Sequence, residues 1–219
     1  MEAVIIPFFK ALLLVPVTLL PIINPLSTAP IFAATVGGNA QLSARLARQV
    51  AINSWYVIVV SMLIGTYVLA LFGISLPVVR IGGGLLVAST AWRMLHRTDE
   101  DDVHAAAAAV TSDMSSVELV RKSFFPLTFP LTTGPGTIAA SIALGAGEPR
   151  SALLYVAGAL IAAGGAALAA LCLYLIFRNA GRVLARLGDV GTLVMMRLMA
   201  FILLCIGIQI MWNGWVELQ

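Results

Sequence analysis

The chain has 219 residues, of which 60% are hydrophobic and only 11% are charged, and its mean hydropathy is +1.00. A soluble domain of this length carries far more charge, so the composition excludes that class and predicts an integral membrane protein. The net charge of +3 arises from 13 Lys and Arg residues that lie between apolar stretches, which excludes a nucleic-acid-binding surface.

A helix that crosses the hydrocarbon core of a bilayer needs about 20 mostly apolar residues. Six segments of this kind are predicted, at residues 11–35, 51–72, 77–96, 122–146, 151–177 and 193–214. Residues 3–9 exceed the length of the first segment and are predicted to lie near the membrane interface. The predicted fold is therefore all-α and integral to the membrane, with six transmembrane helices.

The first predicted helix contains the segment PIINPLSTAP at residues 21–30. A proline in a helix interior removes a backbone donor and clashes with the preceding turn, at a cost of about 3 kcal/mol or more. Pro16, Pro21, Pro25 and Pro30 therefore cannot share one regular helix without compensation. Irregular backbone at membrane depth is tolerated only where protein or a water-filled cavity covers it. We predict a broken helix whose interruption lies near the middle of the membrane.

A polar linker at residues 97–121 divides the chain into a first half at 1–96 and a second half at 122–219, which together form one membrane domain. Each half carries three of the predicted helices. His96, Asp99 and His104 have a spacing that could hold a metal, but a solvated polar loop is the favoured interpretation, and no metal site is predicted.

The fourth predicted helix repeats the pattern of the first. Its sequence is FFPLTFPLTTGPGTIAAS at residues 124–141. Aligning the start of the two halves places Pro25 on Pro135, Ser27 on Thr137, Pro16 on Pro126 and Thr18 on Thr128. A second match later in each half, at a different offset, pairs Arg80 with Arg197. Because each half has an odd number of helices, the two copies must cross the membrane in opposite directions. The sequence thus predicts a 3+3 inverted repeat with broken helices 1 and 4, an architecture typical of secondary transporters.

Residues at the two breaks suit a ligand site. A half-helix that starts after a break presents free N–H groups and the positive end of its dipole, which favour a carboxylate. The alternative is that the prolines only kink packed helices and that the hydroxyls bond to their own turns. The candidate substrate-binding residues are Asn24, Pro25, Ser27, Thr28, Thr132, Thr133, Gly134, Pro135, Gly136 and Thr137.

Arg80, Arg197 and Gln209 are secondary candidates. The arginines either extend toward the lipid headgroups or reach inward to a helix end or a substrate carboxylate. Gln209 and Asn53 are predicted to form interhelical hydrogen bonds. No Asp, Glu or His lies near the middle of a predicted helix, so we predict no proton relay, no catalytic set and no bound cofactor. A coupling cation such as sodium would have to use backbone carbonyl groups.

Basic residues indicate the orientation of the chain. One side of the predicted arrangement collects most of them, and the opposite side has only Lys10, Arg80 and Arg150. By the positive-inside rule both termini face outward and the linker at 97–121 faces the cytoplasm. The residues on the cytoplasmic side are Arg45, Arg48, Arg93, Arg97, Arg121, Lys122, Arg178, Arg182, Arg186 and Arg197.

Three segments resemble the signature segments of the MarC family: INPLSTAPIF at 23–32, PLTTGPGTIA at 130–139 and RIGGGLLVASTAWRML at 80–95. The resemblance covers essentially the whole chain and implies a six-span protein of the bacterial inner membrane. Some members of that family are described as neutral amino-acid transporters. Ser27 and Thr28 stand where many members have Gly-Asn. The family-like residues are Asn24, Pro25, Pro30, Arg80, Gly83, Gly84, Pro126, Gly134, Pro135 and Gly136.

The leading hypothesis is a secondary transporter or exporter of small zwitterionic solutes such as neutral amino acids. Its partners would be the small-molecule substrate and the lipid bilayer, and the content of Ala and Gly permits a homo-oligomer. One alternative is a facilitative pore for a small uncharged solute. Another is a non-transporting membrane protein that acts through its cytoplasmic linker. No enzymatic activity is expected, because no catalytic set can be assembled from the sequence.

Overall fold

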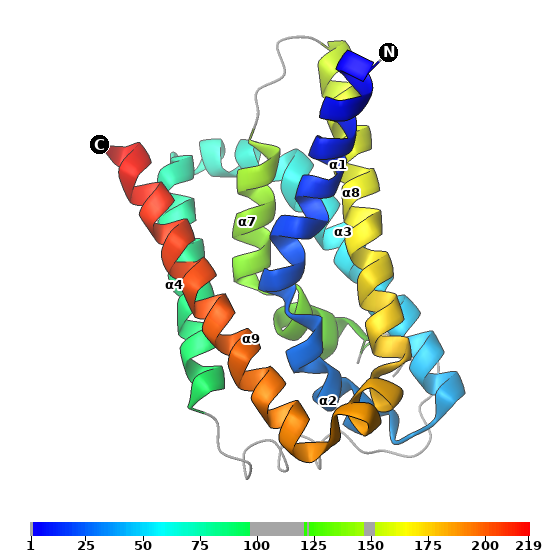
Figure 1. Ribbon diagram of the computed structural model, residues 1–219. Helices are drawn as coiled ribbons and strands as arrows, with labels where there is room; N and C mark the ends of the chain where they lie inside the picture. Colours follow the sequence, from blue (N-terminus) through cyan, green and yellow to red (C-terminus); the bar gives the residue numbers. More distant parts are fainter. Residues whose placement is uncertain (1, 97–120, 122, 147–151) are drawn as a thin grey trace.

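The computed structural model describes residues 2–96, 121, 123–146 and 152–219, and within these ranges every regular element is helical. This confirms the predicted all-α class. The start of α1 lies at the same end of the molecule as the end of α9 (Figure 1). In chain order they are α1 (Glu2–Ile23), α2 (Pro25–Val36), α3 (Ala40–Leu71), α4 (Leu76–Leu95), the π-helical segment η1 (Ser123–Thr132), α7 (Pro135–Gly145), α8 (Ala152–Arg178) and α9 (Ala180–Leu218).

Three helices are long and apolar enough to cross a membrane: α3, the part of α8 from Tyr155 to Arg178, and α9. Helices α1, from Phe9 onward, and α2 form a bent pair with an angle of 60° that makes a fourth span if it is counted as one. The α7 helix is apolar but has only 11 residues. By length and composition, the described residues therefore account for up to four of the six predicted spans.

The helices extend beyond the predicted spans. Residues 3–9 belong to α1. Most of the residues that separate predicted spans at 36–50 and 178–192 belong to α3 and α9. The side chain of Asn39 starts α3 early by accepting hydrogen bonds from the N–H groups of Gln41 and Leu42, each at 3.0 Å. Helix α9 bends at Gly188, whose φ is 67°. Hydropathy marks only the part of a helix that suits lipid, so it underestimates helices with polar ends.

The two broken segments lie at the centre of the bundle. Helix α3 packs on α8, and α4 packs on α9, so these four helices form two outer pairs (Figure 1). Between the pairs, α1 contacts α8, α2 contacts α9, and α7 contacts both α3 and α4. The Phe32 ring stacks on Phe177 with centroids 4.7 Å apart, and Trp55 Nε1 donates to Ala163 O at 3.0 Å, which ties α2 and α3 to α8.

Small residues allow these helices to approach closely. A Cβ atom added to Gly165 would lie 2.8 Å from Leu12 O and 2.6 Å from Val15 Cβ, so α8 meets α1 at this glycine. In the same way Gly145 brings α7 against the backbone of Met62 in α3. The breaks are thus held between tightly packed helices.

Candidate functional site

The first break occurs at Asn24, within the segment at residues 21–30 that the sequence predicts to be broken. Asn24 adopts the left-handed conformation, with φ 49° and ψ 59°, and its N–H donates to Leu20 O at 2.9 Å, which closes the last turn of α1. Pro25 is the first residue of α2, a position at which the missing N–H is not needed. Pro16 and Pro21 lie inside α1, and Pro30 lies inside α2. The four prolines therefore produce one interruption rather than several.

The second break occurs at Gly134, and Pro135 is the first residue of α7. The segment before it differs from α1, because η1 has extended dihedral angles at Phe125 and Phe129. Each of these phenylalanines precedes a proline, which disfavours the helical conformation in the residue before it. The repeat seen in the sequence thus corresponds to similar structure after the breaks and to different structure before them.

The two breaks lie close together. Helix α1 contacts α7 and α2 contacts η1, so the first half of each broken segment lies against the second half of the other. Seven of the predicted site residues are buried here, whereas Pro135 is exposed and its flanking glycines are half-buried. The buried polar residues in this region are Asn24, Ser27, Thr28, Ser54, Ser123, Thr128, Thr132, Thr133, Thr137 and Ser141.

Several of these hydroxyls bond to their own turns. Thr28 Oγ1 donates to Pro25 O at 3.2 Å, Thr128 Oγ1 donates to Ser123 O at 2.7 Å, and Thr132 Oγ1 donates to Leu127 O. The local interpretation of the hydroxyls, left open by the sequence, therefore holds for these three threonines. Their donor hydrogens already have acceptors within the protein.

Helix α3 contributes two residues that the predicted site did not include. Ser54 Oγ accepts a hydrogen bond from Thr133 Oγ1 at 2.8 Å, and both side chains are fully buried. Its neighbour Asn53 donates from Nδ2 to Ser123 Oγ at 3.4 Å, which confirms the predicted interhelical bond. The signal in the sequence was a pair of adjacent polar residues in an apolar segment, but the sequence does not show which helix they face.

Among the described residues, Asn24 Nδ2 is the one buried side-chain nitrogen or oxygen atom that lacks a hydrogen-bond partner. The Oδ1 atom of Asn24 accepts from Ser27 Oγ at 3.0 Å, while Nδ2 has no acceptor. A buried polar group without a partner costs about 1–3 kcal/mol. Such a cost in a region of otherwise local hydrogen bonding marks the Asn24 amide as a donor available to a ligand.

Replacing Thr133 with valine is expected to lower the free energy of unfolding by about 1–2 kcal/mol, because Ser54 Oγ loses its buried donor. The measurement is a double-mutant cycle with Ser54→Ala, in which thermal unfolding in detergent gives the stability of each purified variant. A coupling energy of at least 0.5 kcal/mol between the two substitutions is expected. Strictly additive effects would contradict the hydrogen bond between Thr133 and Ser54 of α3.

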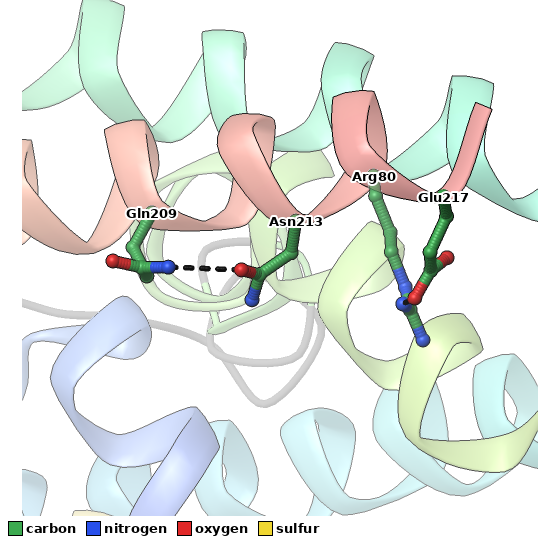
Figure 2. A network of polar contacts seen from close by, with 4 residues as sticks. All are labelled: Arg80, Gln209, Asn213 and Glu217. Carbon is green, nitrogen blue, oxygen red and sulfur yellow. Dashed lines mark hydrogen bonds and ion pairs between the residues drawn. The ribbon is translucent and has the colours of Figure 1, made fainter. Parts of the chain in front are cut away.

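Two of the three secondary candidates are engaged elsewhere. Arg80 forms an ion pair with Glu217 in the last turns of α9, and Gln209 Nε2 donates to Asn213 Oδ1 at 2.8 Å (Figure 2). The predicted interhelical bond of Gln209 is wrong, because the amide finds an acceptor one turn along its own helix. Arg197 is exposed on α9.

The structure describes His96 from the motif considered as a metal site, whereas Asp99 and His104 lie outside the described residues. His96 Nδ1 lies 2.9 Å from Trp92 O. In the part of the chain that is described, no group of three metal-ligating side chains is present.

Comparison with known proteins places this chain in a family. The model of the MarC family of integral membrane proteins matches residues 9–218. The chain belongs to the MarC family. It is 35% identical to the inner membrane protein MarC of Salmonella typhimurium and to that of Escherichia coli O1:K1, and 34% identical to that of Salmonella paratyphi A. Each alignment covers 96% of this chain and 96% of the relative.

The MarC assignment confirms the resemblance seen in the three signature segments. Together with the apolar helices α3, α8 and α9, the inner membrane relatives establish an inner membrane protein. No solved structure matches the chain at a significant level.

Proposed function

We propose that this MarC family member is a secondary transporter or exporter of small zwitterionic solutes such as neutral amino acids. The substrate binds between the two breaks, and the observation that carries the proposal is the pairing of two interrupted helices in a buried polar region. Half-helix ends that meet at mid-membrane are the usual binding device of secondary transporters. The proposal assigns the protein no catalytic role.

The proposed architecture is a six-span 3+3 inverted repeat, with residues 1–96 and 122–219 as the two halves. Its main support is the pattern of helix contacts. If α3 corresponds to α8 and α4 to α9, each pair consists of equivalent helices that pack on each other. The contact of α2 with α9 then corresponds to that of α7 with α4, and the contact of α1 with α8 to that of η1 with α3.

The proposed orientation has both termini outside and the linker at 97–121 in the cytoplasm. It is supported by the common end at which α1 starts and α9 finishes (Figure 1). The basic residues Arg45 and Arg48 in the first turns of α3, and Arg178 and Arg182 near the junction of α8 and α9, occupy the opposite, cytoplasmic side under the positive-inside rule.

The broken helices suit a zwitterion because together they offer both signs of partial charge. The end of α1 presents carbonyl groups, and Pro25 and Pro135 begin half-helices whose N–H groups carry the positive end of a dipole. A substrate ammonium group would bind the carbonyl groups, and a carboxylate would bind the N–H groups. A sodium ion, if one is coupled, would use the same class of carbonyl ligand.

The test is transport by the purified protein in liposomes. We expect saturable uptake of labelled glycine, alanine or serine, with competition by unlabelled substrate. Absence of both binding and uptake, with or without a sodium gradient, would contradict the proposal. Uptake that never saturates and ignores ion gradients would favour a facilitative pore. Loss of cellular function on shortening residues 99–115, with uptake retained, would favour a role of the linker in recruiting a partner.

A further inference from the structure

Asn24 serves two helices at once. It ends α1 in the left-handed conformation and is the residue before the first turn of α2. Asn tolerates a positive φ better than most residues, but Gly tolerates it at least as well and is the usual choice at such a helix end. Backbone conformation therefore explains why the position needs a small or polar residue. It does not explain why the position carries an amide, since Asn24 is buried, with only 5% of its surface exposed.

The orientation of the amide follows from its surroundings. Its Oδ1 accepts from Ser27 Oγ, which belongs to the first turn of α2, and so the oxygen lies at the positive end of that helix. The amide nitrogen is held on the same rigid plane, beside this first turn, and has no acceptor. No side chain caps α2, so the N–H groups of its first turn also lack a side-chain acceptor.

The second break has no amide at the equivalent position. The residue that corresponds to Asn24 is Gly134, which has no side chain, and the threonines Thr128, Thr132 and Thr133 already donate to Ser123 O, Leu127 O and Ser54 Oγ. The two breaks are thus unequal in chemistry although they match in sequence. Buried donor capacity without a partner is concentrated at the first break.

We propose that the Asn24 amide and the start of α2 form the carboxylate-binding half of the substrate site, with Asn24 Nδ2 donating directly to a carboxylate oxygen. A carboxylate satisfies the amide donor, the free N–H groups and the helix dipole together, whereas a neutral oxygen satisfies only the hydrogen bonds. The proposal rests on the proposed transport function and adds the orientation of the substrate. The carboxylate binds at the start of α2 and not at the start of α7.

The test compares three ligands and two variants of the full-length protein in detergent. L-alanine carries both charged groups, propionate lacks the ammonium group, and L-alaninamide lacks the carboxylate. A ligand that binds only the folded protein raises the melting temperature, and a titration yields its affinity. For the wild-type protein we expect alanine to bind most tightly, propionate more weakly, and alaninamide at least 10-fold more weakly than alanine.

Asn24→Gly keeps the left-handed conformation and removes the amide, so it should fold with a similar melting temperature and bind alanine at least 10-fold more weakly. Asn24→Asp keeps an acceptor for Ser27 Oγ and replaces the donor with a second oxygen, so it should weaken binding of alanine and propionate further. Asn39→Asp is the matched control, because it makes the same chemical change at the exposed start of α3 and keeps the capping oxygen. Its affinity should equal that of the wild type.

Wild-type affinity for alanine in both Asn24 variants would overturn the carboxylate assignment and leave the transport proposal intact. If Asn24→Gly does not fold, the isosteric Asn24→Asp decides the question. Equal affinity of the wild type for alanine and alaninamide would also overturn it. Propionate binding that depends on Asn24, without binding of any amino acid, would support the carboxylate site and overturn the proposed substrate. Absence of binding by all three ligands would overturn both.

Discussion

Replacing Gly84 with alanine is expected to push α4 away from α9 and to lower the free energy of unfolding by about 2 kcal/mol or more. A Cβ atom at this position would lie 2.6 Å from both Gly207 O and Met211 N. These are backbone atoms, which cannot move aside as the end of a flexible side chain can. The partner position is equally restricted, because a Cβ at Gly207 would lie 2.6 Å from Ala88 N. Thermal unfolding of the purified protein in detergent measures the change.

The matched control is Gly82→Ala, two residues earlier in the same helix. A Cβ atom there meets nothing within 4 Å. Since alanine favours a helix over glycine by about 1 kcal/mol, stability should stay the same or rise slightly. Equal losses for the two variants would contradict the close approach of α4 and α9 at Gly84.

Replacing Gly134 with alanine is expected to reduce alanine uptake in liposomes by more than 10-fold. The backbone angles at Gly134, φ −80° and ψ −176°, suit any residue, so the cost does not arise from conformation. It arises from space, because a Cβ atom would lie 2.6 Å from Pro130 O in η1. The start of α7 must then shift relative to η1, and the substrate site between the breaks shifts with it.

The control for this variant is Gly158→Ala in α8, where an added Cβ meets nothing within 4 Å. Uptake and melting temperature should be close to those of the wild type. Normal uptake by Gly134→Ala would contradict a functional role for the geometry of the second break. A ligand titration by melting temperature would show whether the loss lies in binding or in the transport cycle.

Much of the candidate site was predictable because proline acts locally. Pro25 and Pro135 cannot donate to the preceding turn, so the sequence marks both as positions where a helix can break. The same argument overestimated the disruption at Pro16 and Pro21, which lie within the regular helix α1. A proline shows where a helix can break, whereas the packing around it decides whether the helix does break.

The partners of the polar side chains were harder to predict. Ser54 meets Thr133 across the bundle, and Gln209 turns to Asn213 on its own helix. A polar residue in an apolar segment must find a partner, and this requirement is visible in the sequence. Which partner it finds depends on the rotation of each helix about its axis, and that is set by contacts with other helices.

The sequence by itself determined the membrane class, the family and the two interruptions, because hydropathy and proline chemistry depend on residues that are close together in the chain. Only the tertiary structure decided that the breaks lie against each other, that α3 supplies Ser54, and that Asn24 Nδ2 alone among the described buried side-chain nitrogen and oxygen atoms lacks a hydrogen-bond partner. These properties depend on distances between residues that are far apart in the chain. Two breaks that match in sequence therefore differ in chemistry, since an asparagine side chain occupies one and a glycine the other.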